Sequence, residues 1–497
     1  MTETPGHGIW NKRCAGILLH PTSLPGPCDD RRLGSDAYRF IDFLAQTGFR
    51  VWQMLPIAPT GQHDSPYQSY SLHAGNFFLI SSDSLVERGW LDSAAVDSGS
   101  KLDHEPRRLL VKALSTFDRT GRPEDRDAFE EFSNKHRYWL DDYALYCAIK
   151  QHYGEKPWWE WPESLRCRTP EGLSSARTSL HRPLRLFRFE QFVFFDQWLA
   201  LRQYANQRDI LLFGDLPMFP AHDSADVWAH QDFFFLDDQG KPEIVAGVPP
   251  DYFSVTGQLW GNPLYQWERL EEHGFCWWIE RLRTQLVLFD LLRIDHFRGF
   301  AACWEIPASA KTAQNGRWVD TPGQELLETL QQHFGDLPLV AEDLGLITPD
   351  VNVLRDQFAL PGMKVLQFAF SGDPNNPHLP YNHEPQSVVY TGTHDNNTTR
   401  GWYEELEAPE RDQVIDFLGP FTEEMPWPII RMALSSVARL AVLPMQDILG
   451  LGSRHRMNTP GTEKGNWTWR FQWEQVTPKL IDRLQLLIHI YGRSRAD

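Results

Sequence analysis

Short apolar runs that end abruptly in polar or turn residues recur along the chain, and they predict buried parallel strands followed by loops. Eight such runs lie at residues 16–21, 51–56, 210–215, 291–295, 339–343, 364–370, 388–395 and 441–447. Segments of helical composition, such as 186–208 and 430–440, lie between most of them. This alternation predicts an α/β fold with a parallel sheet. Eight strands favour a closed (β/α)8 TIM barrel; an open doubly wound sheet with the same alternation is the alternative.

Two connections between these runs are too long for one helix, at about 150 and about 75 residues. We expect them to form insertions on the C-terminal rim of the barrel, a mostly helical one over about 80–185 and a second over about 221–285. No linker-length Gly/Ser or Pro tract and no internal repeat divides the chain. We therefore predict a single catalytic unit over residues 1–497.

Composition narrows the class of protein. Of the 497 residues, 41% are hydrophobic and 13% aromatic, which is enough to bury a large core and excludes a disordered chain. The formal charge of −18 disfavours nucleic acid and acidic membrane surfaces as partners. Six cysteines without a CxxC pair, and no apolar run of membrane-spanning length or signal-peptide pattern, predict a cytoplasmic protein that does not enter a membrane.

Four of the apolar runs end in a carboxylate at or just past their last apolar residue: Asp215, Asp295, Glu342 and Asp395. The carboxyl ends of barrel strands converge on one face, where active sites lie. Any single acidic residue at a strand end is often only a helix N-cap. Four together predict an active site at this face.

Basic and neutral donors accompany these acids. Arg293 precedes Asp295 by two residues, so strand periodicity places both side chains on one face and allows Arg293 to keep Asp295 ionised. His296 and His394 are equally compatible with hydrogen bonds to substrate hydroxyls and with a purely structural role. No metal-binding spacing is found, and residues 222–230 are interpreted as a surface loop. We expect no metal and no organic cofactor.

Paired carboxylates on a barrel rim suit glycosidic chemistry, in which one ionised carboxylate attacks the anomeric carbon and one protonated carboxyl group donates to the leaving oxygen. The chain also contains 20 tryptophans, and aromatic faces stack on the apolar faces of sugar rings. Most of these tryptophans are expected to be core residues, so their number adds only weak support for a sugar substrate.

Eight segments, in order along nearly the whole chain, resemble amylomaltase, the 4-α-glucanotransferase family that includes plant disproportionating enzyme. They are GILLHPTSLPG (16–26), SPYQSYSLHAGN (65–76), GDLPMFPAHDSADVW (214–228), GVPPDYFSVTGQLWGNPLY (247–265), RIDHFRGF (293–300), AEDLG (341–345), YTGTHDN (390–396) and PMQDILGLGSRHRMNTPGT (444–462). The resemblance implies an α-amylase-related barrel without a C-terminal all-β domain. It also implies transfer of α-1,4-glucan segments from a maltooligosaccharide or starch chain to the 4-hydroxyl of an acceptor glucan or glucose.

The resemblance further implies the roles of individual residues. Asp295 is implied as the nucleophile, Glu342 as the general acid/base, and Asp395 as the carboxylate that holds sugar hydroxyls and stabilises the transition state. The residues alone do not decide between Glu342 and its neighbour Asp343. The substrate-binding positions that the motifs imply are Asp215, Arg293, His394, Tyr67, Tyr252, Phe253, Gln258, Trp260 and Asn466.

This assignment predicts a retaining mechanism with a covalent glycosyl-enzyme, and a separation of about 5–5.5 Å between the carboxyl groups of Asp295 and Glu342. Segment 247–253 combines two prolines with two aromatic residues, and we interpret it as a lid that favours a sugar acceptor over water; an inert surface turn has a similar sequence. Two alternatives remain for the whole protein: an α-glucan hydrolase, and a glucan-binding protein without catalytic activity.

Overall fold

Eight parallel strands form the centre of the molecule in the computed structural model, which describes residues 7–26, 33–61, 64–97, 106–250, 255–462 and 464–494. In chain order these strands are β1 (Cys14–Leu18), β2 (Val51–Gln53), β3 (Leu211–Leu216), β6 (Leu291–Ile294), β9 (Leu339–Ala341), β10 (Gly362–Val365), β11 (Ser387–Tyr390) and β12 (Leu440–Pro444). Their spatial order is β10, β11, β12, β1, β2, β3, β6 and β9. The two end strands also meet, because the N–H of Ala341 donates to the carbonyl of Pro361 at 2.8 Å. The barrel is nearly closed, so the eight predicted strands are confirmed and the open-sheet alternative is wrong.

The strands pack closely, as the sequence of β1 illustrates. All residues of β1 and of β12 are buried, as expected for strands that are covered on both faces. Gly16 lies beside Val51 of β2, and a Cβ at residue 16 would come within 2.7 Å of the Val51 Cβ. A larger residue at this position would push the two strands apart.

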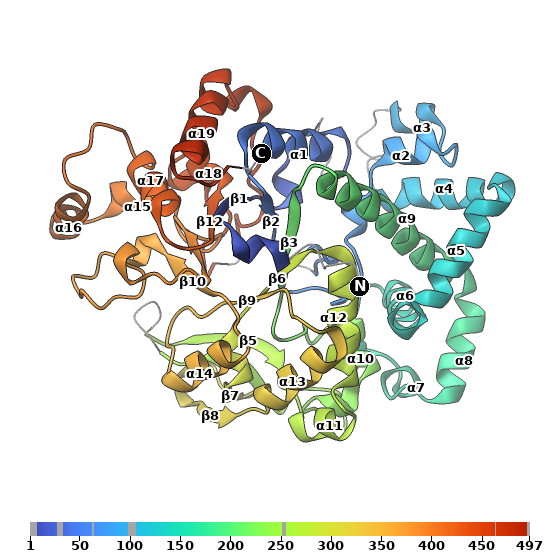
Figure 1. The fold of residues 1–497 in the computed structure, drawn as a ribbon. Helices are drawn as coiled ribbons and strands as arrows, with labels where there is room; N and C mark the ends of the chain where they lie inside the picture. Colours follow the sequence, from blue (N-terminus) through green and yellow to red (C-terminus); the bar gives the residue numbers. More distant parts are fainter. Residues whose placement is uncertain are drawn as a thin grey trace.

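Helices cover the outside of the barrel (Figure 1). They include α1 (Ser35–Thr47), α12 (Cys276–Leu288), α13 (Gly323–Phe334), α14 (Pro349–Gln357), α17 (Trp427–Ser435) and α19 (Pro478–Ile490). The connections after β11 and β12 also contain α15 (Thr399–Glu405), α16 (Ala408–Leu418), which lies at the far left of Figure 1, and α18 (Met445–Ile448). In α1 the helical repeat brings Phe40, Ile41 and Leu44 to one buried face. The ring of Phe40 packs edge-on against Trp52 of β2, with 4.8 Å between ring centroids. This contact joins the helix to the barrel core.

The long connection between β2 and β3 is helical, and it lies at the right of Figure 1. Its helices are α2 (Ser82–Glu87), α3 (Ser93–Asp97), α4 (Pro106–Thr120), α5 (Pro123–Lys135), α6 (Arg137–His152), α7 (Glu163–Arg166), α8 (Pro170–Ser179) and α9 (His181–Asn206). Helices α4, α5 and α6 pack against α9, which in turn contacts β3. None of the helices in the described ranges combines the length and the apolarity needed to cross a bilayer.

A second, antiparallel sheet lies outside the barrel. Its strands are β4 (Ile244–Val248), β5 (Gln258–Pro263), β7 (Ala302–Pro307) and β8 (Arg317–Asp320), in the order β5, β4, β7 and β8. Two short helices, α10 (Ala225–Ala229) and α11 (Trp267–Glu272), flank β4 and β5 in the chain. The sequence analysis places no strands in the connection between β6 and β9, yet β7 and β8 come from there. The division of the chain into one catalytic unit with insertions over 80–185 and 221–285 stays a prediction.

Candidate active site

Three charged side chains meet at the carboxyl ends of β3 and β6. The strand register places Asp215 directly beside Arg293. One guanidinium nitrogen of Arg293, Nη1, donates to both carboxylate oxygens of Asp215 at 2.7 and 2.8 Å, and Nη2 lies 2.9 Å from Oδ1 of Asp295. The predicted pairing of Arg293 with Asp295 on one face is therefore present, and Asp215 shares the same cation.

Burial is uneven within this group. Asp215 is only 2% exposed and Arg293 6%, whereas the side chain of Asp295 is 30% exposed. Burial raises the pKa of Asp215 above its usual value, while the Arg293 charge opposes that shift. The neighbouring carboxylates hold the pKa of Arg293 well above its ordinary value despite burial. Asp295 is the member of the group that has most access to a ligand.

Glu342 follows β9 and approaches the same end of the barrel from the next strand. Its Oε2 accepts a hydrogen bond from the His296 N–H at 2.8 Å, and its Oε1 accepts one from the Leu344 N–H at 3.2 Å. Burial, reinforced by the negative charges of Asp295 and Asp343, raises the pKa of Glu342 to about 8, against the opposing charge of Arg293. Glu342 is therefore protonated at neutral pH.

Asp343 has a different environment from its neighbour. Its Oδ2 accepts a hydrogen bond from Arg355 of α14 at 2.5 Å, and its Oδ1 accepts one from the Met363 N–H of β10 at 2.7 Å. The carboxylate is thus paired with a cation on the barrel wall. Adjacent residues of an extended chain point to opposite sides. Because Asp343 points to the barrel wall, Glu342 is the one of the two that lies on the same side as Asp295.

Tyr67 connects the two halves of the site. Its hydroxyl donates to Oδ2 of Asp215 at 2.8 Å and lies 3.0 Å from Nε2 of His394. Because the hydroxyl proton is given to the carboxylate, the hydroxyl oxygen accepts from His394, which places a proton on Nε2. The two rings also stack, with 5.5 Å between centroids and 19° between planes.

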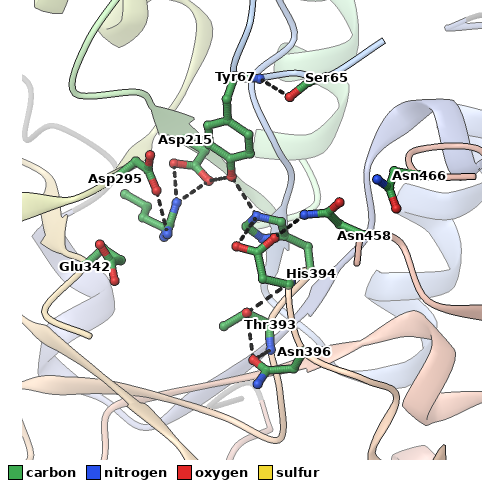
Figure 2. Close-up of polar contacts among 12 residues, drawn as sticks. Ser65, Tyr67, Asp215, Asp295, Glu342, Thr393, His394, Asn396, Asn458 and Asn466 are labelled. Carbon is green, nitrogen blue, oxygen red and sulfur yellow. Dashed lines mark hydrogen bonds and ion pairs between the residues drawn. The ribbon is translucent and has the colours of Figure 1, made fainter. Parts of the chain in front are cut away.

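Asp395 lies on the other side of the site, in the loop after β11. Its Oδ1 accepts a hydrogen bond from Nδ2 of Asn458 at 2.6 Å, and its backbone carbonyl accepts one from Arg456 at 2.9 Å. The Asp395 side chain is 47% exposed and lies 3.4 Å from Nε2 of His394. Figure 2 shows Asp215, Asp295 and Glu342 on one side and His394 and Asn458 on the other.

The sequence analysis missed Asn458 and Arg456. Both lie within the 444–462 segment that carries the resemblance, but their partner is more than 60 residues away in the chain. The residues around them, Arg456-Met457-Asn458, form no motif or periodic pattern that would predict such a contact.

Two further positions, Gln258 and Trp260, border the site through β5. Nε1 of Trp260 donates to Oε1 of Gln258 at 3.1 Å, and the Trp260 ring meets His296 edge-on, with 4.8 Å between centroids. Burial lowers the pKa of His296 to about 4, so this ring is neutral at neutral pH. Trp260 and Gln258 thus extend the site toward the second sheet.

Asn466, another predicted binding residue, stands apart from this group. Asn466 closes its own loop: its amide nitrogen donates to the Thr462 carbonyl at 2.8 Å, and its oxygen accepts from the Thr459 N–H at 3.0 Å. In Figure 2 it lies beyond Asn458, away from the carboxylates. Tyr252 and Phe253, the two aromatic residues of the predicted lid, lie outside the described residues.

A nearly closed barrel with an arginine-paired carboxylate, a carboxyl group whose pKa is raised, and a third, exposed carboxylate at its carboxyl end defines an enzyme of glycosidic-bond chemistry. Comparison with known proteins agrees. The model of glycoside hydrolase family 77, described as 4-alpha-glucanotransferase, matches residues 19–477. The chain belongs to this 4-α-glucanotransferase family.

Individual relatives cover almost the entire chain. The 4-alpha-glucanotransferases of Thermus thermophilus and of Synechocystis are each 48% identical to it, over 96% and 97% of this chain and 98% of each relative. Among solved structures, the amylomaltase from Streptococcus agalactiae in complex with acarbose is 35% identical, with a TM-score of 0.93 over 97% of this chain and all of that one. The similarity therefore extends over both the barrel and its insertions.

Proposed function

We propose that this enzyme transfers α-1,4-glucan segments from a maltooligosaccharide or starch chain to the 4-hydroxyl of an acceptor glucan or glucose by a retaining double displacement. The observation that carries the proposal is the pairing of two unlike carboxyl groups. Asp295 is paired with the guanidinium of Arg293 at 2.9 Å, and Glu342 has a pKa raised to about 8. One group is suited to attack and the other to donate a proton.

In the first step, a carboxylate oxygen of Asp295 forms a bond to the anomeric carbon while the bond to the glycosidic oxygen breaks. Glu342 gives its proton to that oxygen, so the leaving glucan departs with a free 4-hydroxyl. The transition state resembles an oxocarbenium ion, and the product is a glycosyl ester of Asp295.

Formation of the ester prepares the second step. The charge of Asp295 is one cause of the raised pKa of Glu342, and esterification removes that charge. Glu342 then takes the proton of the acceptor 4-hydroxyl, whose oxygen attacks the anomeric carbon and releases Asp295. Glu342 thus acts as the acid in the first step and as the base in the second. The anomeric carbon is inverted twice, so its configuration is retained overall.

The remaining residues bind the sugar in this proposal. Asp395 and His394 hold hydroxyl groups of the sugar that is attacked, and Asp215 and Arg293 keep Asp295 in place. Trp260 and Gln258 contact neighbouring sugar units. Tyr252 and Phe253 are assigned to the acceptor sugar as part of the lid, and Asn466 is a further subsite contact that the resemblance implies.

Incubation of the purified enzyme with maltotriose tests the proposal. A transferase gives glucose together with a ladder of longer maltooligosaccharides and little net change in reducing ends. A hydrolase gives a steady gain of reducing ends, and a binding protein gives neither. Chromatography of the products together with a reducing-end assay distinguishes the three outcomes, and only the first is compatible with the proposal.

The proposed lid at 247–253 is tested separately. Replacement of Tyr252 and Phe253 by alanine removes the aromatic surface that is expected to hold the acceptor and exclude water. The ratio of hydrolysis, measured as the gain of reducing ends, to transfer is expected to rise. An unchanged ratio would remove this segment from the mechanism and leave the assignment of the carboxylates intact.

A further inference from the structure

A single buried carboxylate ties together both ends of the loop at residues 391–399, between β11 and α15. Asp447, in α18 just after β12, is 1% exposed. Its Oδ2 accepts hydrogen bonds from the hydroxyls of Thr391 and Thr399, both at 2.6 Å, and its Oδ1 accepts one from the Thr399 N–H at 2.7 Å. Both threonines are completely buried.

A buried carboxylate is costly unless its charge is compensated. Within the described ranges, no ion pair links a basic side chain to Asp447, and burial raises its pKa while the threonine donors lower it. Among the described residues, the burial of this carboxylate is compensated by three hydrogen-bond donors, which belong to two residues, Thr391 and Thr399. A carboxylate can accept all of them at once because both of its oxygens are acceptors.

The loop between these anchor points carries His394 and Asp395. A pocket of about 30 Å³ is lined by residues 393–394 and 396–398 of the loop and by Pro444, Gln446 and Asp447. The ring of His394 stacks on Tyr67. The hydrogen bonds at the two ends of the loop act together with this packing to set its position.

We propose that Asp447 is a positioning residue for glucan transfer, because it clamps both ends of the 391–399 loop and so sets where His394 and Asp395 meet the sugar. The inference rests on the proposed function, which assigns Asp395 to sugar hydroxyls. A neighbouring side chain assists: Nε2 of Gln367 donates to the Asn397 carbonyl at 2.9 Å. Asp447 itself does not touch substrate.

The loss of kcat in variants of Asp447 should increase with the number of hydrogen-bond donors that lose their acceptor. Asp447→Ala leaves all three donors without an acceptor, and a displaced catalytic loop is expected to lower kcat about 100-fold. In Asp447→Asn, the amide oxygen still accepts from the Thr399 N–H, and the amide nitrogen donates to hydroxyls that turn to accept. We expect the asparagine variant to recover most of the loss, with kcat reduced about tenfold or less.

A double-mutant cycle separates positioning from general destabilisation. Thr399→Val removes one hydroxyl donor, and we expect kcat on maltotriose to fall about tenfold with little change in KM. In an Asp395→Ala background the same substitution should change kcat clearly less, because one of the two groups that it positions is gone and only the effect on His394 remains. Thr47→Val is the matched control, since Thr47 is also fully buried and donates to the Phe43 carbonyl in α1 at 2.7 Å; it should leave kcat unchanged.

The outcomes are distinguishable. Equal losses for Thr399→Val in both backgrounds, or a fully active Thr399→Val enzyme, would overturn the role of Asp447. If Asp447→Ala does not fold, the threonine variants still decide the question. If Asp395→Ala itself leaves kcat unchanged, the proposed role of Asp395 fails rather than the clamp.

Discussion

The two sides of the active site are held in place by different kinds of interaction. On the Asp295 side, charged groups sit on adjacent barrel strands, and Arg293 pairs with two carboxylates within 2.9 Å. On the Asp395 side, a loop is held mainly by hydrogen bonds, from the Asn458 amide, from Arg456 to a backbone carbonyl, and from the threonines around Asp447. The side chain of Asp395 is 47% exposed, against 30% for Asp295.

In the proposed mechanism, the two sides have two different physical tasks. A nucleophile needs a fixed charge at a fixed distance, and strand register together with an ion pair supplies both. A group that binds sugar hydroxyls needs access to substrate, and a loop held by hydrogen bonds allows that access. We therefore expect substitutions on the Asp295 side to have large effects on chemistry and stability, and those on the Asp395 side to have graded effects on rate.

The largest effect is expected for Asp295→Asn, which keeps the shape of the nucleophile and removes its charge. Transfer of glucan segments between maltooligosaccharides should fall by at least about 10⁴-fold, because an amide does not form the glycosyl ester. Product ladders from maltotriose measure this loss. An enzyme that still lengthens and shortens its substrate at the native rate would remove Asp295 from the mechanism.

Arg293→Gln should be the next most severe, and it acts on stability as well as on activity. Without the guanidinium, Asp215 and Asp295 remain as close, uncompensated carboxylates, which is expected to cost about 3–5 kcal/mol in the free energy of unfolding. Urea unfolding followed by tryptophan fluorescence measures it. Arg185→Gln breaks an exposed pair with Asp118 and should cost less than about 1 kcal/mol; similar losses in the two variants would contradict the comparison.

How much of this site was predictable depends on how local each contact is. The Arg293–Asp295 contact joins residues two positions apart at the carboxyl end of β6, so side-chain alternation predicts it. The barrel strands are equally local signals, because each is a short apolar run with a polar end. The choice of Glu342 over Asp343 was not predictable from the residues, since it depends on Arg355 and Met363 from other elements.

Contacts on the Asp395 side are almost all long-range. Asp447 meets Thr391 across 56 positions, and Asn458 meets Asp395 across 63. No periodicity encodes such pairs, because they follow from the closure of the barrel. The sequence analysis also did not predict the second sheet, in which β7 and β8 pair with β4 and β5 from an earlier connection; this pairing likewise joins segments that are far apart in the chain.

The pH profile tests the Asp295 side more finely. Since Glu342 must be protonated for the first step and has a pKa of about 8, kcat/KM should stay level up to about pH 8 and then fall tenfold per pH unit. With α-maltosyl fluoride as donor, the leaving group needs no proton, so this fall should disappear. A persistent fall with the fluoride would assign the alkaline limb to a group other than Glu342.

Tyr67→Phe probes the link between the two sides. The variant keeps the ring that stacks on His394 but removes the hydroxyl that joins Asp215 to His394. Asp215 retains Arg293, so we expect kcat to fall only about tenfold, which corresponds to about 1.4 kcal/mol. Maltotriose kinetics at a fixed pH measure the loss. A decrease as large as that of Asp295→Asn would show that the two sides do not act separately.

The smallest effect is expected for Asn458→Ala, which removes the donor to Oδ1 of Asp395 and leaves the backbone contact from Arg456 in place. Asp395 is half exposed, so water replaces the lost amide and no buried charge is stranded. We expect kcat to fall about three- to tenfold, with an unchanged free energy of unfolding. A loss of several kcal/mol in stability would mean that the Asp395 side is as tightly coupled to the fold as the Asp295 side.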